Sequence, residues 1–227
     1  MDNARMQNKT KPKYTNAILI TVALLSLVLG YWFSQQLHIQ NRDGSIPEGL
    51  EATVLDKARP LSAFALQDHD KQPFNQQTIK GHWSFLFFGY THCPDVCPLA
   101  LKVMQDTWKQ IPHDPNDPAA PRMFFVSVDP DRDTPELLKQ YVRYFDPAFI
   151  GVTGKADEID KLTGQLGILY GFEDKDPETG NYNVNHSAQL LLIDPQGRLR
   201  AVVSPPHDPA TIASNFLTIR EYYGDNT

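Results

Sequence analysis

Trp83-Ser-Phe-Leu-Phe-Phe-Gly89 is followed at once by Tyr90-Thr-His-Cys-Pro-Asp-Val-Cys-Pro98. The first stretch is apolar almost throughout, which is typical of a central strand covered on both faces. The second holds the only two cysteines among 227 residues, Cys93 and Cys97, and residues with helical spacing come after it. A strand that leads into a cysteine pair at the start of a helix predicts a site for soft-metal or redox chemistry.

Further strands and helices alternate along the rest of the chain. Besides 83–89, strands are expected at 61–66, 123–128, 149–152, 188–193 and 199–203, and helices at 99–111, 135–145, 156–169 and 209–223. From residue 83 onward the order is βαβαβαββα, and the last two strands form a hairpin. This order predicts an α/β fold, a thioredoxin-like mixed sheet flanked by helices and ending in a C-terminal β-hairpin.

Local signals set some of the boundaries. Thr134 before Pro135 and Glu136 predicts a helix start, with a hydroxyl N-cap, proline at the first position and an early acid. Leu169 is expected on the apolar stripe of the helix that begins at Ala156. Residues 174–183 are polar and turn-rich, which predicts an exposed loop.

The N-terminal region is apolar and uncharged. No charged residue occurs between Lys13 and Arg42, and such a span can cross a bilayer as one helix. Positive charges precede it, so the N-terminus is expected to stay in the cytoplasm. The competing interpretation is a cleaved signal peptide, which is disfavoured because Gly30 leads into bulky Tyr-Trp-Phe and not into a small-residue cleavage site.

We therefore expect four regions. They are a cytoplasmic tail at 1–13, a transmembrane anchor at 14–36, a linker at 37–59 and a thioredoxin-like domain at 60–227. Nothing in this N-terminal region resembles the Arg- and Ser-rich amphipathic sequence of a mitochondrial import signal, which points to a bacterial envelope protein. The expected location is the bacterial inner membrane, with a single pass and the soluble domain on the periplasmic side.

Charge separates along the same boundaries. Residues 1–13 carry four positive charges and one negative charge, so the total of −6 leaves −9 for the remainder. An acidic domain argues against nucleic acid and suits a basic patch on a protein partner. Solubility alone explains the acidity equally well.

The cysteine pair favours function over structure. On the first turn of a helix, Cys93 and Cys97 share one face, where they can clamp an ion or close a disulfide. A structural disulfide is the alternative in an oxidising compartment, but a bridge over three residues stabilises little through chain entropy. Two thiolates are too few for a stable zinc site, whereas Cu(I) accepts low coordination and prefers sulfur.

A third ligand can come from one of the seven histidines. His186 is the best placed, because it lies directly before the strand 188–193 at a sheet end. His92 is a weaker candidate, since neighbours in an extended segment point apart. The remaining five are interpreted as solvated: His38, His69, His82, His113 and His207.

Two acids follow the strand at 123–128. Asp129 and Asp133 lie at the end of a sheet where sites usually form. They are expected to fix loops around the site or to pair with Arg132, and this structural role is at least as good an explanation as direct chemistry.

The three motifs together resemble the Sco/SenC family of copper proteins. They are Gly89–Pro98, Ser127–Pro135 and His186-Ser187, and the similarity covers roughly residues 60–223. The resemblance implies a membrane-tethered thioredoxin-like domain that binds one copper ion, Cu(I) or Cu(II), through Cys93, Cys97 and His186. It also implies a role in assembling the dinuclear copper centre of cytochrome c oxidase subunit II, by copper delivery, by reduction of its cysteines, or by both. Other copper chaperones and thiol reductases are further expected partners.

One residue departs from the family pattern. Asn185 stands before the histidine where the family often has an aspartate, so a charge that orients the imidazole or contacts a partner is absent. The leading hypothesis is an assembly factor and not a turnover enzyme. The alternatives are a general thiol–disulfide oxidoreductase of the cell envelope, with Cys93 and Cys97 as its redox-active pair, and, more distantly, a peroxide-reducing enzyme.

Overall fold

The structure is a computed structural model that describes residues 15–40, 50, 54–112 and 120–224. The chain separates into two units, residues 1–45 and residues 46–227. Helix α1 (Thr15–Gln40) belongs to the first unit. Among the described residues, no helix combines the length and apolarity that a membrane span requires. The tail expected at 1–13 lies outside the described residues.

The second unit is built on an eight-stranded mixed sheet, with the strand order β1-β10-β9-β4-β5-β6-β2-β3. A separate two-stranded sheet pairs β7 with β8. The strands are β1 (Val54–Pro60), β2 (Ala65–Asp68), β3 (Pro73–Asn75), β4 (Ser84–Gly89), β5 (Arg122–Ser127), β6 (Ile150–Thr153), β7 (Tyr170–Phe172), β8 (Val184–His186), β9 (Leu190–Ile193) and β10 (Arg198–Val203).

Three parallel strands form the centre of the large sheet. β4 pairs with β5, and β5 with β6, all in parallel. Every residue of β4 is buried, as its apolar sequence predicts. β9 runs antiparallel to β4, with Phe87 opposite Leu190. The beginning of β9 therefore lies beside the end of β4, which places the segment before β9 close to the cysteine loop.

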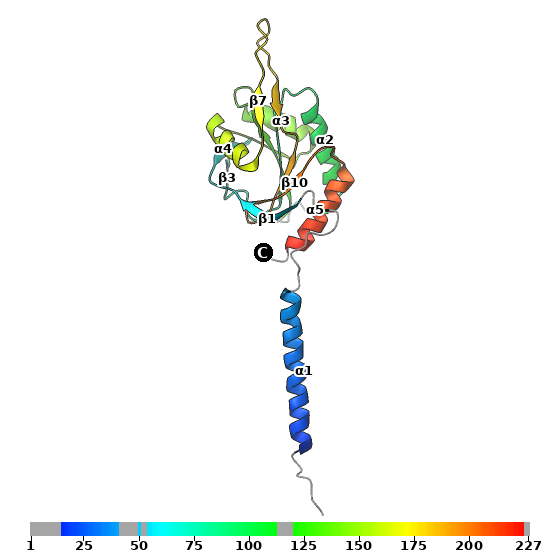
Figure 1. The fold of residues 1–227 in the computed structure, drawn as a ribbon. Helices are drawn as coiled ribbons and strands as arrows, with labels where there is room; N and C mark the ends of the chain where they lie inside the picture. Colours follow the sequence, from blue (N-terminus) through cyan, green and yellow to red (C-terminus); the bar gives the residue numbers. More distant parts are fainter. Residues whose placement is uncertain (1–14, 41–49, 51–53, 113–119, 225–227) are drawn as a thin grey trace, which may run out of the picture. The chain divides into compact units, whose positions relative to one another are not determined.

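Helices cover both faces of the sheet (Figure 1). They are α2 (Val96–Trp108), α3 (Pro135–Phe145), α4 (Ala156–Leu166) and α5 (Pro209–Gly224). Phe85 meets Trp108 of α2 and Phe216 of α5, at ring-centroid distances of 6.4 and 5.1 Å. Phe125 meets Tyr141 of α3 at 5.4 Å. Side chains alternate along strands, so α2, α3 and α5 share one face. Figure 1 shows α4 on the other side of the sheet from α2 and α5.

From β4 onward the predicted order of strands and helices is confirmed, except that the hairpin β7–β8 is added between α4 and β9. The thioredoxin-like mixed sheet, its flanking helices and the closing hairpin β9–β10 are all present. The expected cap of α3 is also present, since the Thr134 hydroxyl accepts a hydrogen bond from the Leu137 amide at 3.3 Å.

The linker expected at 37–59 is wrong in its last part. β1 occupies Val54–Pro60 and pairs with β10 at the edge of the sheet. Most of its side chains are at least partly exposed, and an edge strand of this kind is held through its main chain on one side. Its sequence therefore lacks the apolar alternation that would identify a strand.

Two other boundaries also differ from expectation. The short strand expected at 61–66 lies slightly later, as β2. The helix expected to reach residue 169 ends at Leu166, because Gly167 adopts a left-handed conformation with φ 74°. Leu169 is consequently 78% exposed and does not lie on the buried stripe. The exposed loop expected at 174–183 is confirmed. The residues on either side of it form the hairpin β7–β8, and its tip projects from the domain in Figure 1.

Candidate metal centre

The two cysteines come from one loop and the histidine from another. Cys93 lies in the turn between β4 and α2, and its amide donates to the Tyr90 carbonyl at 3.3 Å. Cys97 is the second residue of α2, so only this cysteine stands within the helix as expected. His186 is the last residue of β8. The antiparallel start of β9 returns the chain to the end of β4, and this topology brings His186 to the cysteine loop.

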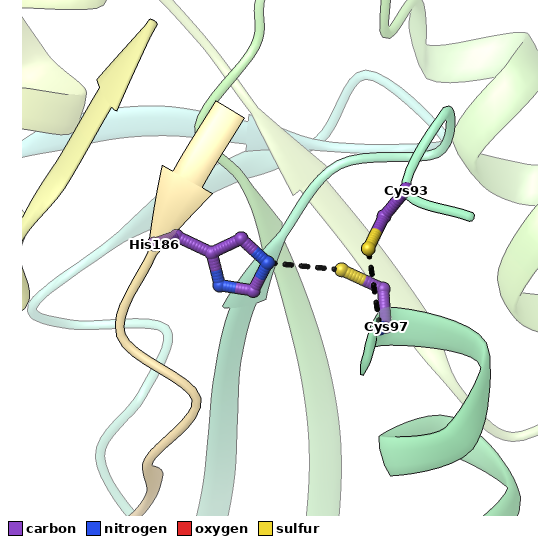
Figure 2. Close-up of side chains that lie close together, drawn as sticks. All are labelled: Cys93, Cys97 and His186. Carbon is purple, nitrogen blue, oxygen red and sulfur yellow. Dashed lines mark hydrogen bonds between the residues drawn. The ribbon is translucent and has the colours of Figure 1, made fainter. Parts of the chain in front are cut away.

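Figure 2 shows how the three side chains converge. One ligand atom from each of Cys93, Cys97 and His186 lies within 4.8 Å of the others. The Cys97 sulfur lies 3.2 Å from His186 Nε2, and the Cys97 amide donates to the Cys93 sulfur at 3.4 Å. Neither cysteine is part of a disulfide, so all three groups are available to hold one ion.

The orientation of the imidazole is fixed on several sides. His186 Nδ1 lies 3.1 Å from the Ser187 carbonyl oxygen, which can only accept, so Nδ1 carries the proton. The unprotonated Nε2 then faces the Cys97 sulfur. Phe87 and Tyr90 meet the ring edge to face at 6.1 and 6.0 Å. The nitrogen that is free to bind a metal therefore points at the thiols.

The pKa values of the two cysteines shift in opposite directions. A hydrogen bond with Cys97 lowers the pKa of Cys93 to about 4. Cys97 is fully buried, and its bond to Cys93 together with its burial raises the pKa of Cys97. The metal-free pair at neutral pH is thus one thiolate, on the half-buried Cys93, and one thiol that donates to it.

Gly89 lets Cys97 approach the sheet. A Cβ at position 89 would lie 2.5 Å from the Cys97 sulfur, closer than real Cβ atoms come to a neighbour, and in tight contact with the Phe125 ring at 3.0 Å. Nothing in the sequence outside the motif itself identifies this role, because it depends on the packing of α2 against the end of β4.

The donor set fits a soft monovalent ion. Two sulfurs and one imidazole nitrogen are ligands that Cu(I) prefers, and three donors match its low coordination number. A structural zinc site normally has four protein ligands. Among the described residues, these three are the one group of cysteine, histidine and carboxylate side chains close enough to hold an ion together.

The other histidines lie elsewhere. His92 is outside the cluster, with Nδ1 3.1 Å from the Thr91 hydroxyl. His207 Nε2 bonds the Ala188 carbonyl at 2.8 Å, and His82 is partly buried. The side chain of His38 and all of His113 lie outside the described residues.

The expectation that His69 is solvated is wrong. It is buried, and its Nδ1 accepts the Gly151 amide at 2.9 Å. Its polar neighbours Asp68 and Asp70 give the segment the composition of an exposed turn, so its sequence does not reveal that the ring faces inward.

The two acids after β5 are structural. Asp133 accepts from the Thr91 amide at 3.0 Å and from the Ser127 hydroxyl at 2.6 Å. Burial raises the pKa of Asp133. Asp129 pairs with Arg132 Nε at 2.5 Å. Both expected roles, fixing the loops and pairing with Arg132, are therefore confirmed.

A thioredoxin-like domain that brings two free cysteines and a histidine together at one end of its sheet has the donor set of a thiol-based metal-binding protein. Comparison with known proteins makes the class specific. The SCO1/SenC family model matches residues 53–221. The chain belongs to the SCO1/SenC family.

Relatives and solved structures agree with this placement. The SCO2-like protein of Rickettsia prowazekii is 37% identical over 143 residues, which are 63% of this chain and 68% of that protein. Arabidopsis thaliana ScoI with copper bound is 30% identical with a TM-score of 0.64, and the match covers 71% of this chain and 98% of that one. Bradyrhizobium japonicum ScoI with copper bound is also 30% identical, with a TM-score of 0.62 and coverage of 72% and 99%.

Proposed function

We propose that this protein binds one copper ion through Cys93, Cys97 and His186 and helps to assemble the dinuclear copper centre of cytochrome c oxidase subunit II. The observation that carries the proposal is the convergence of two sulfurs and one imidazole nitrogen within 4.8 Å. The copper-bound relatives support the identity of the ion. Family membership supports the role in oxidase assembly.

The proposed setting is the bacterial inner membrane. Residues 14–36 are the proposed anchor, 37–53 the proposed linker, and the acidic remainder of the chain stands on the periplasmic side. The support is the uncharged span between Lys13 and Arg42 and the positive charges before it. An anchored carrier works at a fixed distance from a membrane-bound target, which raises its effective concentration there.

Copper is the cargo in this proposal. Cys93 is half-buried and Cys97 is fully buried, so an acceptor thiolate reaches the site on the Cys93 side. A pocket of about 280 Å³ borders Cys93, His186 and Asn185 and gives an incoming ligand room. Exchange of one ligand at a time moves the ion without releasing it into water. Other copper chaperones are the proposed source of the ion.

Copper titration tests the assignment. The purified, reduced protein is expected to take up one equivalent of Cu(I), and Cys93→Ala, Cys97→Ala and His186→Ala are each expected to weaken binding sharply. Asn185→Ala, next to the histidine but outside the ligand set, is the matched control and is expected to retain the stoichiometry. Unchanged affinity in all three ligand variants would reject the proposal.

A second function is favoured by one observation, the lowered pKa of Cys93. A stable thiolate attacks a disulfide in a partner and forms a mixed disulfide. Cys97 then attacks the Cys93 sulfur, so the partner leaves with two thiols and the Cys93–Cys97 disulfide forms. Spent protein then needs a thiol reductase as a further partner.

Trapping separates the two functions. If thiol exchange dominates, Cys97→Ser is expected to accumulate a mixed disulfide with its target, because the second attack is blocked. The variant His186→Ala tests for copper delivery. A thiol exchanger has no need of the imidazole. Loss of oxidase assembly in this variant, while the reduction potential of the Cys93–Cys97 pair stays unchanged, therefore favours copper delivery.

A further inference from the structure

His186 lies on a hairpin that is not hydrogen-bonded into the main sheet, so other contacts must fix its position. His186 ends the hairpin β7–β8, residues 170–186, which forms a sheet of its own beside the eight-stranded one. Cys93 and Cys97 belong to the loop and helix that follow β4. The contacts that hold this hairpin against the main domain therefore decide where the imidazole nitrogen lies.

Tyr182, four residues before His186, makes several of these contacts. Its hydroxyl donates to Asp129 Oδ1 at 2.8 Å, and its carbonyl accepts from Arg132 Nη1 at 2.9 Å. The Arg132 guanidinium also lies 3.6 Å from the centre of the Tyr182 ring. Side chain, main chain and ring face are thus bound by the same two residues of the loop after β5.

The two residues that hold Tyr182 are themselves fixed. The Asp129 side chain is fully buried, and its amide donates to the Ser127 hydroxyl at 3.0 Å. Arg132 Nε donates to Asp129 Oδ2 at 2.5 Å. Moving either partner leaves a charge unpaired in a buried place, which is strongly unfavourable. The pair is therefore a rigid support and not a mobile surface ion pair.

The same arginine borders the imidazole's surroundings from a second direction. Its guanidinium lies 5.5 Å from the centre of the Tyr90 ring, and that ring meets His186 edge to face at 6.0 Å. Arg132 consequently lies between the hairpin and the Tyr90 ring that packs against His186.

We propose that Asp129, Arg132 and Tyr182 form a latch that positions His186 for copper binding. The inference rests on the proposed copper function and adds three positioning residues to it. They act through the hairpin backbone and the Tyr90 ring, and the ligand atoms remain those of Cys93, Cys97 and His186. Breaking the latch keeps all three ligand residues in the chain but allows the His186 imidazole to move away from Cys93 and Cys97.

The experiment measures Cu(I) affinity of the full chain, purified in detergent and reduced, by competition with a chromogenic Cu(I) chelator. Tyr182→Phe removes only the hydrogen bond from the Tyr182 hydroxyl to Asp129. Arg132→Met removes the hydrogen bond from Arg132 to the Tyr182 carbonyl and the ion pair of Arg132 with Asp129. Each is expected to weaken binding about tenfold or more, the usual effect of removing a group that orients a metal ligand. In a His186→Ala background the same substitutions are expected to have no further effect.

A matched control comes from the opposite end of the sheet. Arg198 also pairs with a buried aspartate, Asp194, at 2.9 Å, but it lies on β10 and touches neither the hairpin nor the site. Arg198→Met is expected to keep wild-type copper affinity. Thermal unfolding of each metal-free variant shows whether the fold survives, and Tyr182→Phe serves where Arg132→Met does not fold.

The outcomes separate the latch from the function it rests on. A wild-type protein without Cu(I) affinity would overturn the proposed function and the latch with it. Wild-type binding that His186→Ala weakens, but that the latch variants leave unchanged, would overturn the latch alone. Equal weakening by the latch variants with and without His186 would also overturn it, because the effect would then not pass through the imidazole.

Discussion

At the scale of single residues, the site depends on how closely α2 approaches the end of β4. Position 89 has no room for a side chain, since the nearest atom to a Cβ there is the Cys97 sulfur. Glycine is required at position 89 by this contact and not by an unusual backbone conformation, because Gly89 does not have a positive φ angle.

Gly89→Ala is therefore expected to displace the Cys97 sulfur and to weaken Cu(I) binding, while overpacking lowers the free energy of unfolding by about 1–3 kcal/mol. Chelator competition and urea unfolding measure the two effects. Gly164→Ala is the control: a Cβ at this helical position meets nothing within 4 Å, so copper affinity stays unchanged and stability rises by about 0.5–1 kcal/mol. Wild-type copper affinity in Gly89→Ala would contradict the packing argument.

The reactivity of Cys93 is a second prediction at this scale. With a pKa of about 4, Cys93 is a thiolate throughout the range from pH 5 to pH 8, where an ordinary thiol with a pKa of about 8.5 is protonated. The rate of its alkylation by iodoacetamide is expected to stay level across this range and to fall only near pH 4. Cys97→Ala removes the hydrogen bond and moves the midpoint toward 8.5, whereas Cys97→Ser keeps a donor and a low midpoint. A wild-type midpoint near 8.5 is the opposing result.

At the scale of elements, helix α3 forms where the sequence predicts it, because Thr134, Pro135 and Glu136 supply its start locally. Its N-cap bond joins the Thr134 hydroxyl to the Leu137 amide. Thr134→Ala is expected to lower the free energy of unfolding by about 1 kcal/mol, as measured in urea, and Thr134→Ser to restore most of it. No loss in the alanine variant would show that the cap contributes nothing.

Elements defined by distant contacts were not predictable in the same way. The buried run of β4 and the apolar stripes of the helices identify themselves, because burial sets their composition. β1 is polar and exposed, and only its pairing with β10 makes it a strand. The end of α4 depends on Gly167 adopting a left-handed conformation, which overrides the apolar Leu169 three residues beyond the helix.

The candidate site likewise contains some residues that the sequence predicts and others that only the fold reveals. Cys93 and Cys97 follow from their spacing after a buried strand, and His186 from its place before β9. Tyr182 carries no sequence signal of its own, since a tyrosine in a polar loop is unremarkable until Asp129 and Arg132 are seen beneath it. The geometry of the imidazole was therefore accessible only from the fold.

At the scale of the whole molecule, the topology of the sheet assembles the site at one end. Parallel β4 and β5 deliver the cysteine loop and the Asp129–Asp133 loop to the same edge, and antiparallel β9 begins there. The opposite half of the sheet serves as support. There His69 joins the end of β2 to β6, through its amide to the Gly151 carbonyl at 2.8 Å and through its ring to the Gly151 amide at 2.9 Å.

His69 is expected to make stability depend on pH. Burial lowers the pKa of His69 below 6.5, against the opposing charge of Asp70. The unfolded chain thus binds a proton more readily than the folded one, so stability is fully present above pH 6.5 and declines as the pH falls from 6.5 toward the lowered value. Urea unfolding between pH 7.5 and 5 measures this decline.

His69→Ala leaves the Gly151 amide without its partner and is expected to cost about 1–3 kcal/mol at pH 7.5, with a weaker dependence on pH. His69→Asn offers an oxygen acceptor and is expected to recover part of the loss without restoring the pH dependence. An alanine variant as stable as wild type would mean that the ring does not join β2 to β6.

The most direct test of the central claim is X-ray absorption at the copper edge, on Cu(I)-loaded wild-type protein and on His186→Ala. The wild-type spectrum is predicted to require two sulfur ligands and one nitrogen ligand, and the variant spectrum to lose the nitrogen. A nitrogen contribution that persists unchanged without His186, or a wild-type site with fewer than two sulfurs, would contradict the assignment of Cys93, Cys97 and His186 as the copper ligands.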